Sequence, residues 1–90
     1  MANKRWVTDG KRYELCFTPF YEEECVLSFC QDKDDPTCFW YVSDQMKVEY
    51  DCEFANSIEE AKEMFEERYA DHIREEIAYY ESLLDKWEEE

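Results

Sequence analysis

The sequence predicts an α+β domain in which an antiparallel meander of four or five strands precedes one long C-terminal helix packed on one sheet face. Short runs of β-branched and aromatic residues alternate with turn residues in the first part of the chain. After residue 56, apolar residues recur every three or four positions without an intervening glycine or proline. We therefore expect a single domain over residues 1–90, with the sheet in 1–55 and the helix in 57–88.

The first two expected strands form a hairpin. Residues 5–8 and 11–17 are joined by Asp9 and Gly10, a pair that favours a tight type I′ turn. The second strand should end at Pro19, because proline has no amide proton to donate to a strand ladder.

Three further strands are expected at residues 25–30, 38–42 and 46–54. Residues 38–42 are apolar on both faces, which is typical of an interior strand. The last strand alternates between two unlike sets of residues. Its apolar set is expected to face the core and its charged set to face water; the two sets are Met46, Val48, Tyr50, Cys52 and Phe54, and Lys47, Glu49, Asp51 and Glu53.

Ser57 and Glu60 form a capping box that predicts where the helix begins. A helix over 57–88 would be about 45 Å long at 1.5 Å per residue, which exceeds a small sheet. Its last turns should therefore fray, fold back on the sheet, or pack on a partner such as a second copy, and a bend near Tyr69–His72 is an alternative to a straight helix. Its apolar stripe comprises Ile58, Ala61, Phe65, Tyr69, Ile73, Ile77, Tyr80, Leu84 and Trp87.

The charge of the chain is strongly negative. Twenty-five Asp and Glu residues oppose ten Lys and Arg residues, for a formal net charge of -15. Solubility of a small domain asks for a net charge of only about 2 to 8. Such a field repels nucleic acids and anionic membranes and attracts basic surfaces, so we expect no direct nucleic-acid or membrane binding. An origin in a generally acidic proteome is the alternative explanation.

Five cysteines are present, an odd number, and none are spaced as C-x-x-C. We expect free, mostly buried thiols in a reduced, cytoplasmic protein, with disulfides as the alternative. No apolar run approaches the roughly 20 residues of a transmembrane helix.

The inventory of reactive residues predicts neither an enzyme nor a metal or cofactor site. His72 is the single histidine, and the cysteines lie in apolar strand-like segments that disfavour the thiolate. Asp32, Asp34 and Asp35 resemble the start of a calcium loop, but the glycine and glutamate that such a loop needs further on are missing.

Acidic residues at strand spacing could imitate a phosphate backbone. Residues i and i+2 of a strand lie roughly 6.7 Å apart, and consecutive phosphates of one nucleic-acid strand lie about 7 Å apart. An ordinary solvated face is the alternative reading. The candidate partner-binding residues are Glu22, Glu23, Glu24, Asp32, Asp34, Asp35, Glu49, Asp51, Glu53, Glu63, Glu67 and Asp71.

In its size and charge the chain resembles the small acidic nucleic-acid-mimic inhibitors encoded by bacteriophages, among them anti-CRISPR and anti-restriction proteins. The row Glu49, Asp51 and Glu53, the run 22–24 and the helix acids carry this resemblance. It implies an inhibitor in the host cytoplasm that binds the basic surface of a nucleic-acid-binding protein, such as a CRISPR effector nuclease, and blocks DNA or guide RNA binding. The alternative is a protein-interaction or assembly module, monomeric or homodimeric, with aromatic anchors at Trp6, Phe20, Tyr21, Tyr79 or Trp87.

Overall fold

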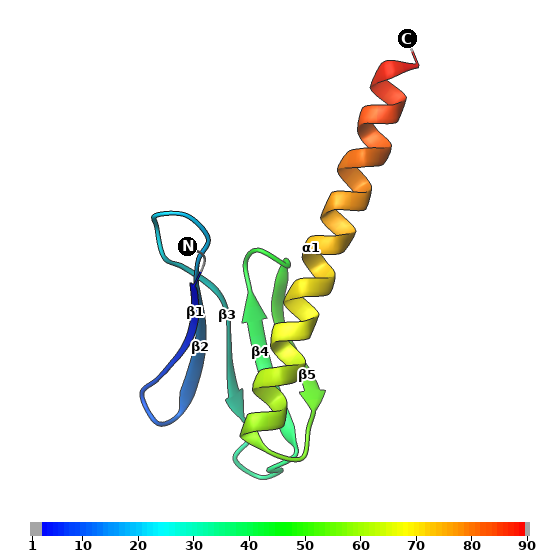
Figure 1. Ribbon diagram of the computed structural model, residues 1–90. Coiled ribbons are helices and arrows are strands. Elements are labelled where there is room, and N and C mark those ends of the chain that lie inside the picture. The colour runs from blue at the N-terminus through cyan, green and yellow to red at the C-terminus, as the bar shows by residue number, and fades with distance from the viewer. Residues whose placement is uncertain (1–2, 90) are drawn as a thin grey trace.

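Five antiparallel strands and one helix form the part of the chain that the computed structural model describes, residues 3–89 (Figure 1). The strands lie in the sheet in the order in which they follow along the chain. This confirms the predicted α+β meander with one long C-terminal helix. The elements are β1 (Asn3–Thr8), β2 (Arg12–Thr18), β3 (Glu24–Gln31), β4 (Cys38–Ser43), β5 (Val48–Phe54) and α1 (Ile58–Glu88).

The turn between β1 and β2 differs from the predicted type. A type I′ turn needs two positive φ angles, and Gly10 has one (98°), whereas Asp9 does not. The prediction of type I′ is therefore wrong. Instead, the carboxylate of Asp9 stabilises the turn by accepting hydrogen bonds from the amides of Lys11 and Arg12, each at 2.9 Å.

The core lies between the sheet and the first half of α1. Phe65 of α1 is fully buried, and its ring lies 5.0 Å from that of Phe29 and 4.8 Å from that of Tyr41. Phe29 also packs edge-to-face on Phe39. These aromatic contacts join the helix to the central strand β3 and to its neighbour β4, which is interior as predicted.

The N-terminus of α1 is capped as the sequence indicates. Ser57 Oγ accepts a hydrogen bond from the amide of Glu60 at 3.1 Å. The carboxylate of Glu60 reaches back to the amide of Asn56, at 3.3 Å, one residue before the cap. Because Ala61 and Phe65 are the buried helix residues, the cap lies next to the turns that hold the helix on the sheet.

The second half of α1 extends beyond the sheet. Figure 1 shows the helix continuing straight past the ends of the strands, so it neither bends sharply nor folds back on the sheet. Ile77, Tyr80, Leu84 and Trp87 are all exposed. The apolar stripe predicted to cover the sheet therefore does so only in its first half.

From Tyr50 onward, the two faces of β5 are reversed relative to the prediction. Asp51 pairs with Tyr41 and Glu53 with Phe39, so these two acids lie on the helix-covered side of the sheet. Tyr50 and Phe54 are exposed. The prediction that the apolar side of this strand faces the core therefore holds for Met46 and Val48, which pack against the core. It is wrong for Tyr50, Cys52 and Phe54, because the strand register shifts between Tyr41 and Ser43.

All five cysteines lie on the open face of the sheet, opposite the helix. Cys16 pairs with Cys25, and Trp40 pairs with both Cys30 and Cys52. Cys38 lies on the same side of β4 as Trp40, whose ring stacks on Tyr50 at 5.1 Å. The thiols are free as expected, but Cys16 and Cys38 are buried whereas Cys25 is exposed.

Candidate partner-binding surfaces

The side chains considered for catalysis do not lie together. His72 Nε2 is 3.7 Å from a carboxylate oxygen of Glu76, and its ring stacks on Tyr69. Burial raises the pKa of the Cys16 and Cys38 thiols, which disfavours the reactive thiolate. Among residues 3–89, no group of three or more potential ligands is arranged to hold a metal ion. That the protein is not an enzyme stays a prediction.

The helix does not meet the requirements for a membrane span. Over the part of the chain that the structure describes, no helix is both long enough and apolar enough to cross a bilayer.

An acidic groove of about 540 Å³ lies between the β4–β5 side of the sheet and α1. We call it the β5–α1 groove. Glu67, Asp71 and Glu75 contribute carboxylates to it, and Arg68 and His72 are its basic side chains. Its apolar floor includes Tyr41, Met46, Val48 and Met64.

Four of the twelve predicted partner-binding acids form ion pairs with arginines of the same chain. Arg5 binds Glu23 through two hydrogen bonds of 2.7 and 2.8 Å. Arg68 pairs with Glu53 at 2.6 Å. Arg74 bonds to both Glu67 (3.1 Å) and Asp71 (2.6 Å). These acids are therefore partly neutralised at the surface.

Two further acids of the set stabilise the turn between β3 and β4. Asp32 accepts hydrogen bonds from the amides of Asp34 and Asp35 and from the indole of Trp40. Asp35 accepts from the amide and the hydroxyl of Thr37. The local sequence thus has a structural role that explains its likeness to a calcium loop.

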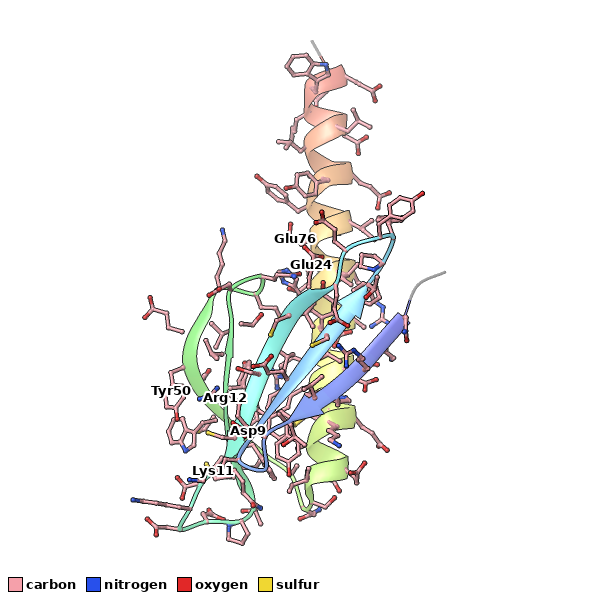
Figure 2. All side chains as sticks on the ribbon, turned by 90° about the vertical axis from the view of Figure 1, so that its left-hand side faces the viewer. Asp9, Lys11, Arg12, Glu24, Tyr50 and Glu76 are labelled. Carbon is pink, nitrogen blue, oxygen red and sulfur yellow. The ribbon has the colours of Figure 1, made fainter. Side chains whose placement is uncertain are left out.

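The predicted acids do not form one patch. The turn at 32–35 lies at the end of the sheet where the helix begins, whereas the loop at 19–23 lies at the opposite end (Figure 1). Figure 2 shows Asp9 and Lys11 at one end of the molecule and Glu24 and Glu76 towards the other. The remaining acids of the set are exposed and form no ion pair with any described residue: Glu22, Glu24, Asp34, Glu49, Asp51 and Glu63.

The loop between β2 and β3 combines exposed aromatic and acidic side chains. Phe20 is 79% exposed and Tyr21 97% exposed. Together with Pro19, Glu22 and Glu24, they line a shallow hollow of about 330 Å³. Trp6, also predicted as an anchor, is instead half-buried, and its indole donates a 2.7 Å hydrogen bond to Glu66.

The projecting arm, which we define as residues 73–88 of α1, carries seven of the twelve exposed large apolar side chains among the described residues. Its exposed apolar residues are Ile73, Ile77, Tyr79, Tyr80, Leu83, Leu84 and Trp87. Their spacing was visible in the sequence. That the sheet would not reach them depends on the position of the helix, which the periodicity does not fix.

Comparison with known proteins gives no relative from which a role could be transferred. No family model matches the chain, and neither a curated protein nor a solved structure is significantly similar to it.

Proposed function

We propose that this protein is a non-catalytic inhibitor that binds the basic, nucleic-acid-binding surface of another protein and blocks DNA or guide RNA binding. A CRISPR effector nuclease is one target of this kind. The observation that carries the proposal is the net charge of -15 on 90 residues. A field of this strength increases the rate of association with a basic surface, and the effect weakens with salt.

The internal ion pairs engage most of the basic side chains, and they also reduce the set of acids that are free to bind a partner. Six of the ten basic residues pair with acids of the same chain, namely Lys4, Arg5, Lys62, Arg68, Arg74 and Lys86. Few basic side chains are then left to offset the other carboxylates. The proposal consequently rests on the acids without such partners.

Glu49 and Asp51 are the best placed of these acids. Both are exposed on β5, an edge strand of the sheet. Glu53 follows them on the same strand. It forms an ion pair with Arg68, which lines the β5–α1 groove. Arginines of a partner could bind the carboxylates in the two-bond geometry that they use with phosphate.

A second candidate function is a protein-interaction module anchored by aromatic residues. The exposure of Phe20 and Tyr21 in the β2–β3 loop favours it. Aromatic side chains of this kind commonly dominate the binding energy of protein interfaces.

One capture experiment separates the two functions. The immobilised protein is exposed to a bacterial lysate, and captured proteins are challenged with duplex DNA and then with increasing salt. If the protein is an inhibitor of the proposed kind, both duplex DNA and increasing salt should release the captured proteins. The inhibitor proposal also expects that Glu49→Gln with Asp51→Asn weakens capture more than the matched pair Asp34→Asn with Glu63→Gln, which removes the same charge elsewhere. Capture that resists DNA and salt but is lost with Phe20→Ala and Tyr21→Ala would favour the interaction module.

A further inference from the structure

The projecting arm carries an apolar stripe with the spacing of a coiled coil. Ile73, Ile77, Tyr80, Leu84 and Trp87 are separated by four, three, four and three residues, as are the d and a positions of a heptad. They are between 38% and 78% exposed. If a fully exposed large apolar side chain offers about 200 Å², the five together offer roughly 600 Å², at the upper end for an ordinary monomer surface.

We propose that this stripe packs against the same stripe of a second copy, in an antiparallel two-helix coiled coil. Complete burial of both stripes would remove at most roughly 1,200 Å² of apolar surface from water, which is the lower limit for stable, specific interfaces. The buried area alone does not determine which helix packs on the stripe, or whether that helix runs parallel or antiparallel to α1. The arrangement of large and small residues, and of charges, selects both.

The antiparallel register places the two aromatic residues of the stripe opposite smaller side chains. When Ile77 faces Tyr80 of the second copy, Ile73 faces its Leu84, and Ala70 faces its Trp87. Ala70 and Ile73 line a mostly apolar cavity of about 200 Å³ with Phe17 and Tyr69, and Lys4 and Glu66 complete its lining together with Leu15 and Val26. The exposed indole of Trp87 from the second copy would enter this cavity beside the smallest side chain of the series.

The flanking charges also favour the antiparallel direction. In this register Arg74 of each copy lies opposite Glu81 of the other, giving two pairs of opposite charge. The existing bonds of Arg74 to Glu67 and Asp71 both come from Nη1, which leaves Nη2 and Nε able to donate. Glu67 and Glu88 face each other as like charges, and the bond from Arg74 to Glu67 offsets part of that repulsion.

A parallel pairing lacks this complementarity. There Glu76 of each copy would face Glu81 of the other on both sides of the seam, so both pairs would repel. The parallel direction also takes Trp87 away from the cavity next to Ala70.

Sedimentation equilibrium of the full chain under reducing conditions tests the pairing. We expect a species of twice the 11.1 kDa chain mass, and a dissociation constant raised at least tenfold by Trp87→Ala. Tyr79→Ala is the matched control, because it removes an exposed aromatic residue from the same arm but off the stripe; it should leave the dimer intact. Far-UV circular dichroism verifies that each variant keeps its helix.

Charge exchange tests the direction and register. Arg74→Glu and Glu81→Arg should each weaken the dimer, and the double variant should restore it, because the opposite-charge pairs re-form. A tighter dimer with Glu81→Arg alone would overturn the antiparallel arrangement, since that change relieves the parallel repulsion. Failure of the double variant to restore the dimer would overturn the register.

Two other outcomes would overturn the proposal altogether. One is a monomeric chain at all accessible concentrations. The other is a monomer that binds one synthetic amphipathic helix with Leu at a and d and Lys at e and g, which would assign the arm to a basic-flanked helix of another protein.

Discussion

The guanidinium of Arg68 on α1 lies 2.6 Å from the carboxylate of Glu53 on β5, so the helix is linked to an edge strand of the sheet by an ion pair. The pair has two consequences. It holds the helix above the β5–α1 groove, and it neutralises one of the three acids that β5 offers to a basic partner.

Arg68→Ala should separate these two effects. Because both side chains are partly solvated, the pair contributes less than about 1 kcal/mol to the free energy of unfolding. Loss of the arginine leaves Glu53 unneutralised, so binding to a basic partner should become tighter and more dependent on salt. Urea unfolding measures the first effect and binding at two salt concentrations the second. Arg68→Lys, which keeps the charge, is the control, and unchanged binding by Arg68→Ala would count against the proposed role of β5.

Phe65 should be essential to the fold. Its ring is buried between Phe29 and Tyr41, so Phe65→Ala removes a large side chain and leaves a cavity, at a cost of about 3–5 kcal/mol. Ile77→Ala lies on the projecting arm and should change the stability of the monomer by less than about 0.5 kcal/mol. Chemical denaturation at low protein concentration compares the two. Equal losses would mean that the arm packs on the sheet after all.

The meander and the helix were predictable because local patterns encode them. Turn residues separate the strands, and Ser57 with Glu60 defines the start of α1. The faces of β5 were not predictable, since alternation shows that two faces differ but not which one the helix covers. Phe29 and Phe39 occupy the core, whereas Tyr50 stacks on Trp40 on the open face and Phe54 is exposed there.

The candidate site was predictable in its charge but not in its arrangement. A count of acids gives the net charge, whereas Arg5 and Glu23, 18 residues apart, form an ion pair only because β1 lies beside the start of the β2–β3 loop. The exposure of the projecting arm was not predictable from the sequence either. The stripe has the same period on either side of Ile73, so the sequence does not mark where the sheet ends.

The capping interaction of Ser57 should stabilise the packed half of α1. Ser57→Ala removes the acceptor for the amide of Glu60 and should lower the free energy of unfolding by about 1 kcal/mol. Ser82→Ala, on the exposed arm, is the control, and it should be neutral or slightly stabilising because alanine is the better helix former. Thermal and urea unfolding give both values. A Ser57→Ala protein as stable as the parent would show that the cap has no energetic role.

Glu66 should make stability depend on pH in the acid range. Burial alone would raise the pKa of its carboxyl group, but hydrogen bonds from Lys4 and Trp6, both 2.7 Å long, outweigh burial and lower it. A group whose pKa is lower in the folded state stabilises the fold above its unfolded pKa of about 4.3, and that contribution is lost as the pH falls through the folded value.

Comparison with Glu66→Gln isolates this contribution from the general relief of repulsion that acid brings to a chain of net charge -15. The parent should be the more stable protein at neutral pH, because the ionised carboxylate accepts stronger hydrogen bonds than the amide. The difference should shrink as the pH falls through the folded pKa, since a protonated Glu66 resembles the glutamine. Urea unfolding across that range measures it, with Glu63→Gln as the exposed control for the loss of one charge. A difference that stayed constant with pH would mean that packing, and not the ionised carboxylate, is what Glu66 provides to Trp6 and Lys4.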